Sequence, residues 1–276
     1  MEITTDYAAT ANEMPWLVFK LKDQHFAVNS SNIVTIFQIE QNVTKVPEYP
    51  ENVRGIINLR GDVVPLLELR RVLGMPLFKE EQQSFYDMLE QRKNDHIAWV
   101  SELKRCLKND EKFTLATDHH KCAFGKWYDT YKTDNATVQF HLNKIDEPHK
   151  NLHAIAKQAI ECPRDCANCT RTECLQKLVA KASEEYMPIV VNLLEEAKTV
   201  FQDSYREMCV VVTNGETVLG LLVDEVNAVQ ALSPVGTADN LNGIYKSSLV
   251  SHVAKSENID GEILVLNEAQ LFTSIA

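Results

Sequence analysis

The hydrophobic pattern of this chain changes its period twice, and this limits the folds that the chain can adopt. From Pro15 to about Leu77, short β-branched runs such as "WLVFKL" and "IVTIFQI" alternate with Gly, Pro, Asn and Asp, which is typical of strands. From about Glu80, apolar residues recur at three-and-four spacings, as in "FYDMLEQRKNDHIAWVSELKRCL", which indicates amphipathic helices. Strand-like runs return at Met208 with "MCVVVTN" and "ETVLGLLVDEV". A helical segment therefore separates two β segments.

Each β segment is too short to form a closed sheet alone, so one β domain with a helical insertion is simpler than three units. We place the first β part at residues 14–78, the insertion at 79–206 and the second β part at 207–276. The insertion carries 19 basic and 21 acidic groups, whereas the flanks together carry 9 and 18. We expect four helices in the insertion, with a kink at Pro188 in the last one.

The charge and the motif content exclude several functions. A net charge of −11 provides no basic footprint, so nucleic-acid binding and membrane-surface binding are disfavoured. We find no leader-like start and no apolar run of about 18 residues, and therefore expect a cytoplasmic protein without membrane insertion. The sequence contains no phosphate-cradling, His-Glu-x-x-His or Gly-x-Ser-x-Gly motif and no nucleotide lid of a histidine kinase, so we do not expect an enzyme.

Histidines and one cysteine are spaced for a metal site across several helices. His149 and His153 are four residues apart and would project from one helix face, with Pro148 at the first position of that helix. His96 precedes Cys122 by 26 residues and His149 follows it by 27, which allows one helix per segment. Three helices of an antiparallel bundle could thus present three nitrogens and one thiolate to a tetrahedral zinc ion.

The strings "HIAWV", "DHHKCAFGKWYDTY" and "PHKNLHAIA" resemble the chemoreceptor zinc-binding (CZB) domain over residues 80–160. The pattern of that family is a His near a Trp, a Cys-x-x-Gly-x-Trp core and a final His-x-x-x-His. The resemblance implies four zinc ligands, namely His96, Cys122, His149 and His153. His119 and His120 match no ligand position, and with Asp118 they are expected to be solvated or to support the ligands. The family also implies a possible homodimer through the helical insertion.

A second resemblance covers the β segments. Residues 46–70, "VPEYPENVRGIINLRGDVVPLLELR", resemble CheW-type chemotaxis coupling proteins, and "VLGLLVDEV" and "GEILVLN" match their second half in order. The resemblance implies an α+β multidomain fold in which a pair of small five-stranded β-barrels is interrupted by an antiparallel helical bundle. It implies a CheA-type histidine kinase and the cytoplasmic tips of chemoreceptors as partners. We expect Arg60, helped by Ile33 and Ile36, to meet the receptor, and Gly55 to lie at the kinase-facing surface.

Four cysteines in "ECPRDCANCTRTEC" fit neither resemblance. They have the spacing C-x3-C-x2-C-x4-C and are Cys162, Cys166, Cys169 and Cys174. A second zinc, an iron–sulfur cluster, a reversible disulfide pair and unbound thiols all remain open. Cys106 and Cys209 lie within apolar patterns and are expected in the core.

These observations predict a chemotaxis adaptor with a zinc–thiolate sensor in its insertion. Zinc would hold Cys122 as a thiolate, and oxidation of this sulfur would weaken its bond to the metal. The input would be an oxidant such as hypochlorous acid, or zinc itself. Two alternatives stay open, a redox or electron-transfer regulator that uses the Cys162–Cys174 cluster, and a constitutive scaffold in which zinc is purely structural.

Overall fold

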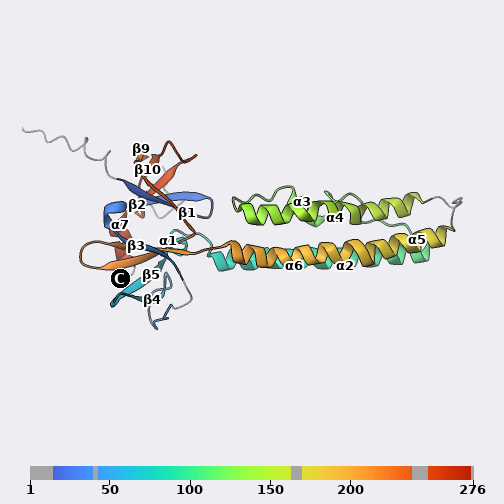
Figure 1. Cartoon of the computed structure of the whole chain (residues 1–276), viewed down its shortest axis with the longest axis horizontal. Helices are drawn as coiled ribbons and strands as arrows, with labels where there is room; N and C mark the ends of the chain where they lie inside the picture. Colours follow the sequence, from blue (N-terminus) through green and yellow to red (C-terminus); the bar gives the residue numbers. More distant parts are fainter. Residues whose placement is uncertain (1–14, 40–42, 163–169, 238–247, 275–276) are drawn as a thin grey trace, which may run out of the picture. The chain divides into compact units, whose positions relative to one another are not determined.

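The computed structural model of the chain divides into two compact units (Figure 1). The structure describes residues 15–39, 43–162, 170–237 and 248–274. One unit is built from strands on both sides of the insertion and includes residues up to Leu77 and from Tyr205 onward. The other unit, Phe78–Ser204, is helical.

The β unit contains two sheets. One is six-stranded with the order β8-β1-β2-β11-β10-β9, and the other is five-stranded with the order β3-β6-β7-β5-β4. The strands before the insertion are β1 (Trp16–Leu21), β2 (Gln24–Asn29), β3 (Ile33–Gln38), β4 (Val53–Leu59) and β5 (Asp62–Glu68). The strands after it are β6 (Met208–Thr213), β7 (Val218–Val223), β8 (Glu225–Gln230), β9 (Ser233–Thr237), β10 (Val250–Lys255) and β11 (Ile263–Leu266). Short helical segments are η1 (Ser30–Asn32), α1 (Leu69–Val72) and α7 (Glu268–Thr273).

Strands from the two sides of the insertion pair with each other. β1 pairs with β8 and β3 with β6 in antiparallel fashion, whereas β2 pairs with β11 and β5 with β7 in parallel. Alternate residues of both sheets, such as Leu17 and Phe19 of β1 and Val210 and Val212 of β6, enter one buried apolar cluster. The two β segments therefore form a single unit.

The prediction of a pair of five-stranded barrels was wrong in the strand number of one sheet and in closure. One sheet has six strands, and within the described residues neither sheet closes on itself. The sequence run "ETVLGLLVDEV" is not one strand, because the chain bends at Asp224 and passes from β7 in one sheet to β8 in the other. Arg70 Nε and the Tyr205 hydroxyl donate to Asp224 Oδ1 at 2.9 and 3.2 Å, which holds this bend in place.

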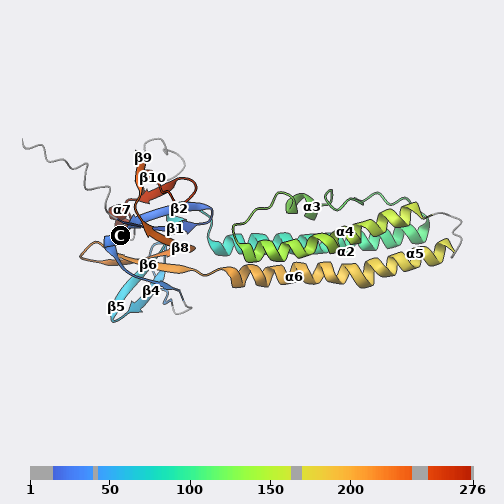
Figure 2. The ribbon, with the colours of Figure 1, turned by 45° about the horizontal axis from the view of Figure 1, so that its top comes forward.

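The helical unit consists of three long helical segments and one short helix. These are α2 (Phe78–Asn109), α3 (Ala123–Tyr128), α4 (Ala136–Glu161), and a last segment made of α5 (Arg171–Ala180), the π-helix η2 (Lys181–Tyr186) and α6 (Met187–Ser204). α6 packs against both α2 and α4, and the connection that contains α3 runs along the bundle (Figure 2). Among the described residues, no helix combines the length and the apolar character needed to cross a membrane.

The prediction that a helix begins at Pro148 was wrong. α4 begins at Ala136, where the Asn135 side chain accepts hydrogen bonds from two backbone N–H groups, and Pro148 lies inside the helix. A proline in a helix interior costs about 3 kcal/mol or more. Packing outweighs this cost, because residues on both sides of Pro148, among them Ile145 and Leu152, are fully buried on one face. The sequence also predicts a kink at Pro188, which lies in α6. The six-residue π-helix η2, an irregular stretch of this helical segment, ends at Tyr186, two residues before that proline.

Candidate metal centre

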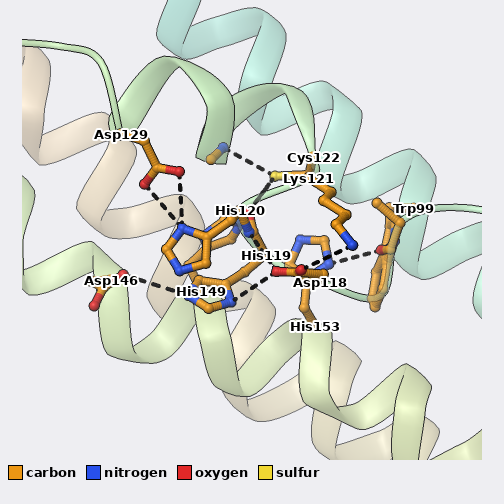
Figure 3. A network of polar contacts seen from close by, with 12 residues as sticks. Trp99, Asp118, His119, His120, Lys121, Cys122, Asp129, Asp146, His149 and His153 are labelled. Atoms are coloured by element: carbon orange, nitrogen blue, oxygen red, sulfur yellow. Dashed lines mark hydrogen bonds and ion pairs between the residues drawn. The ribbon is translucent and has the colours of Figure 1, made fainter.

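Three helices bring one cysteine and three histidines together in the helical unit. His96 lies on α2, Cys122 is the N-cap residue of α3, and His149 and His153 lie on α4. One ligand atom from each residue lies within 4.8 Å of those from the other three. The three histidines are at most 2% exposed and Cys122 is half-buried. Figure 3 shows Cys122 together with the two α4 histidines. The structure thus groups all four residues that the sequence predicts as ligands.

Backbone carbonyls fix the tautomer of two of these histidines. His96 Nδ1 lies 2.6 Å from the Arg92 carbonyl oxygen, and His153 Nδ1 lies 3.0 Å from the Ala116 carbonyl oxygen. A carbonyl only accepts hydrogen bonds, so Nδ1 carries the proton in both rings and Nε2 carries a lone pair. An imidazole that donates from one nitrogen and ligates through the other is the usual arrangement of metal-binding histidines.

The Nε2 atoms face the cysteine sulfur. His149 Nε2 lies 3.3 Å and His96 Nε2 4.0 Å from Cys122 Sγ. His153 Nε2 is buried, and no hydrogen-bond partner for it occurs among the described residues. A buried polar atom without a partner requires an explanation. A cation ligated by this lone pair supplies one, so the donor set fits a metal ion with nitrogen and sulfur ligands.

Burial keeps the histidines neutral. It lowers the pKa of His96, that of His153 to about 4 and that of His149 to about 2, and for His153 and His149 repulsion from the neighbouring imidazoles adds to the effect. The three rings therefore carry lone pairs at neutral pH, which is the form that binds metals.

For Cys122, burial disfavours the form that binds metals, which is the thiolate. Burial raises the pKa of its thiol, although the Gly125 N–H donates to Sγ at 3.2 Å and favours the thiolate. In the thiol form, Sγ donates to the His119 carbonyl oxygen at 3.2 Å. A bound divalent cation would supply the positive charge that holds this sulfur as a thiolate.

Gly125 explains the Cys-x-x-Gly spacing. A Cβ atom at Gly125 would lie 1.9 Å from the His119 carbonyl oxygen and 2.8 Å from the His120 Cα atom. Only glycine lets the first turn of α3 approach the preceding segment this closely. Trp127, the last member of the motif, packs in an aromatic cluster with Phe85, Phe124 and Tyr131.

Three polar residues that precede Cys122, namely Asp118, His119 and His120, lie outside the cluster. His120 is exposed and its Nδ1 lies 3.0 Å from the Asp129 carboxylate, whereas His119 is half-buried with its ring 5.7 Å from that of His149. Asp118 accepts a hydrogen bond from the His120 backbone N–H at 3.1 Å. His119 contacts the candidate ligand Cys122 through its backbone oxygen, which sequence reasoning did not identify.

Two known domain families match this chain. Residues 15–112 match the CheW-like domain, and residues 96–160 match the chemoreceptor zinc-binding domain. The chain contains both domains. Residues 205–276 lie outside both matches, but their strands pair with β1, β2, β3 and β5 of the CheW-like domain.

Individual known proteins are also similar to this chain. The chemotaxis protein CheW of Helicobacter pylori is 36% identical over 85 residues, which is 31% of this chain and 50% of that protein. CheW of Thermotoga maritima is 30% identical over 77 residues, 28% of this chain and 50% of that protein. The chain thus spans about half the length of the curated relatives that it matches. The alignment with the crystal structure of scaffolding protein TtCheW from Thermoanaerobacter tengcongensis covers 92% of this chain and 88% of that chain. The sequence identity is 13% and the TM-score is 0.39.

The residues predicted to bind partners lie on the CheW-like unit. Arg60 is exposed in the turn between β4 and β5 with a φ of 55°. Ile33 and Ile36 of β3 are partly buried against the core. Gly55 is buried in β4, and a Cβ atom there would lie 2.4 Å from the Thr44 carbonyl oxygen. The close approach of two backbones therefore accounts for this glycine, and the partner-binding roles of all four residues stay predictions.

The four-cysteine segment is only partly described. Cys162 follows the last residue of α4 and Cys174 lies in α5, while Cys166 and Cys169 lie outside the described residues. The described part of the chain holds no second group of metal-binding side chains. A second zinc or an iron–sulfur cluster stays a prediction. Cys106 and Cys209 are buried in apolar clusters, which confirms their predicted place in the core.

Proposed function

We propose that this chain is a non-enzymatic chemotaxis adaptor that couples chemoreceptors to a CheA-type histidine kinase and carries a zinc–thiolate sensor in its inserted domain. The observation that carries the proposal is the buried three-histidine, one-cysteine cluster in a domain inserted between paired strands of a CheW-like unit. The match to a chemoreceptor zinc-binding domain supports zinc as the metal.

Zinc fits the donor set. His96, His149 and His153 would each contribute an imidazole nitrogen and Cys122 a thiolate, which completes a tetrahedral site. Four protein ligands leave no open position for a reacting water, so such a zinc ion would not be catalytic.

Cys122 is the ligand best placed to react with an oxidant. It is half-buried, whereas the three histidines are nearly inaccessible. As a thiolate it would reduce hypochlorous acid by two electrons, so that the oxygen goes to sulfur as sulfenic acid and chlorine leaves as chloride. The oxidised sulfur is a poorer ligand, and the segment before α3 would be released from the cluster. Direct sensing of zinc through reversible loss of the ion is the second possible input.

Chain connectivity provides a route to the coupling unit. Phe78 follows directly on Leu77 and Ser204 directly precedes Tyr205, so both ends of the bundle continue into the CheW-like unit. There, Arg70 donates to the Pro76 carbonyl oxygen at 3.0 Å, and both Arg70 and Tyr205 bond to Asp224 at the bend between the sheets. A change in helix packing would thus reach the strands on which the coupling surface depends.

Partners and location follow from the same proposal. Arg60, Ile33 and Ile36 would contact a chemoreceptor, Gly55 would lie on the kinase side, and the protein would act in the cytoplasm. A homodimer would form through the helical unit, where Ile97, Phe140 and Ile189 are exposed.

The test compares the parent with Cys122→Ser for zinc content, by elemental analysis, and for receptor-dependent kinase activity, before and after treatment with hypochlorous acid. We expect oxidant to release zinc and change coupling in the parent but not in Cys122→Ser. Cys174→Ser, whose half-buried thiol lies in the same unit outside the His96–Cys122–His149–His153 cluster, should respond to oxidant as the parent does, and a lost response there would favour the Cys162–Cys174 alternative. If coupling is unchanged by oxidant in every protein, the sensor is refuted and the adaptor is not.

One observation favours a second candidate, a constitutive scaffold with structural zinc. The histidines are at most 2% exposed, as expected for the ligands of an ion that only holds the helices together. Zinc loss at unchanged secondary structure would support the sensor, whereas zinc loss accompanied by unfolding of the bundle would support a purely structural zinc ion.

A further inference from the structure

The Ala116 carbonyl oxygen accepts hydrogen bonds from two side chains on different helices. Trp99 Nε1 of α2 donates to it at 2.9 Å and His153 Nδ1 of α4 at 3.0 Å. Both side chains are buried, with 5% of Trp99 and 1% of His153 exposed. Figure 3 shows Trp99 beside His153. A carbonyl oxygen has two lone pairs, so these two donors occupy both of them.

We propose that Trp99 is a positioning residue of the metal centre, which acts through the Ala116 carbonyl to fix the tautomer and orientation of His153. This inference rests on the proposed function, because it assumes that His153 ligates zinc. The ring centroids of Trp99 and His153 are 4.6 Å apart, so the indole also limits how far the imidazole can rotate.

His153 depends on this contact more than His96 does. The Nδ1 partner of His96 is the Arg92 carbonyl oxygen one turn earlier in the same helix, whose position the helix itself fixes. The partner of His153 lies instead in the connection between α2 and α3, residues 110–122, which has no regular helix or strand of its own. Another contact must therefore hold that carbonyl in place.

The Trp99 indole provides the contact. Its N–H bonds to Ala116, and its ring packs edge-on against Phe113 of the same connection with centroids 5.3 Å apart. Without the N–H, the carbonyl can turn away and the proton of His153 can move to Nε2. The lone pair that faces the cluster is then lost. Because Cys122 follows Ala116 by six residues in the same connection, Trp99 also restrains the segment that carries the thiolate.

The test uses the full chain with Trp99→Phe and, as a matched control, Trp16→Phe. Trp16 lies in β1 of the CheW-like unit and packs edge-on against His252, so it belongs to neither the bundle nor the metal centre. Zinc affinity is measured by competition with a chromophoric chelator, and the visible spectrum of the cobalt-substituted site reports the ligand field. Loss of a group that orients a histidine ligand weakens metal binding about 10- to 100-fold. We expect that loss for Trp99→Phe, and a change below about threefold for the control.

A double-variant experiment separates positioning from general stability. In a His153→Ala background, Trp99→Phe should cause no further loss of zinc affinity, because the ligand on which it acts is absent. An equal loss in both backgrounds, or an affinity of Trp99→Phe within about threefold of the parent, would overturn the proposal.

A metal-free measurement distinguishes failure of this inference from failure of the proposed function. Nitrogen-15 NMR of the zinc-free protein should show His153 protonated at Nδ1 in the parent and a mixture of tautomers after Trp99→Phe. If that variant does not fold, 3-benzothienylalanine at position 99 keeps the bicyclic shape and lacks only the N–H donor. A parent that binds no zinc would refute the proposed function, whereas an unchanged His153 tautomer in the altered protein would refute this inference.

Discussion

The substitution Gly125→Ala should disable the metal centre without touching a ligand. The new Cβ atom would lie 1.9 Å from the His119 carbonyl oxygen, well inside any contact that real atoms make. The first turn of α3 must therefore move away, and the Gly125 N–H then loses the Cys122 sulfur, from which it lies 3.2 Å.

Two energetic contributions determine how much zinc affinity the Gly125→Ala protein loses. Overpacking of a close contact costs about 1–3 kcal/mol. A hydrogen bond to a charged acceptor, here the thiolate of the zinc-bound state, contributes about 1.5–3 kcal/mol. A combined loss of about 3 kcal/mol lies near the lower end of these ranges, and it corresponds to a zinc affinity roughly 100-fold weaker.

Chelator competition measures this affinity, and the thiolate-to-metal absorption of the cobalt-substituted protein reports whether Cys122 is still a ligand. Gly236→Ala is the control, because a Cβ atom at that glycine meets nothing within 4 Å. A Gly125→Ala protein that binds zinc within about threefold of the parent would refute the reasoning, since the close approach at α3 would then not define the site.

Two further predictions concern stability. The metal-free protein should lose unfolding free energy as the pH falls from about 6.5 toward 4, because His149 and His153 remain neutral when folded but take up protons when unfolded. His153 alone accounts for about 3 kcal/mol of this loss, so urea unfolding at both pH values should show a smaller loss in His153→Gln, and an equal loss would contradict the assignment. Asp224→Asn should destabilise the CheW-like unit by about 3–5 kcal/mol, because it leaves the buried Arg70 without its charge partner. Glu51→Gln, which alters an exposed ion pair, should cost less than about 1 kcal/mol in the same urea titration, and equal effects of the two variants would contradict this reasoning.

Periodicity predicted the order of strands and helices well, because each run must present one apolar face to a core. The strand-like runs at both ends occur where the sequence indicates them, and Asn214–Gly215 lies in the hairpin turn between β6 and β7. The histidines and Cys122 could be grouped because their spacing allows residues of separate helices to meet, although the segment that precedes Cys122 has no regular structure of its own.

The errors arose where tertiary contacts override a local preference. Pro148 is a typical first residue of a helix, but buried side chains on both sides of it keep α4 continuous. Asp224 is one polar residue in a strand-like run, and only its contacts with Arg70 and Tyr205 reveal that the chain changes sheets there. Ala116 acts through its backbone oxygen, for which the sequence carries no side-chain signal.

The pairing of strands across the insertion bears on how the chain folds. Strands β3 and β6 must pair across an insertion of 127 residues, from Phe78 to Ser204. Phe78 and Phe201 stack with centroids 5.6 Å apart, so the folded bundle brings its own two ends together. Replacing a flexible loop of that length by an effective link of about four residues removes five doublings of loop length, or about 3 kcal/mol of closure entropy. Early formation of the bundle therefore favours correct strand pairing, and a bundle that forms slowly should delay assembly of both sheets.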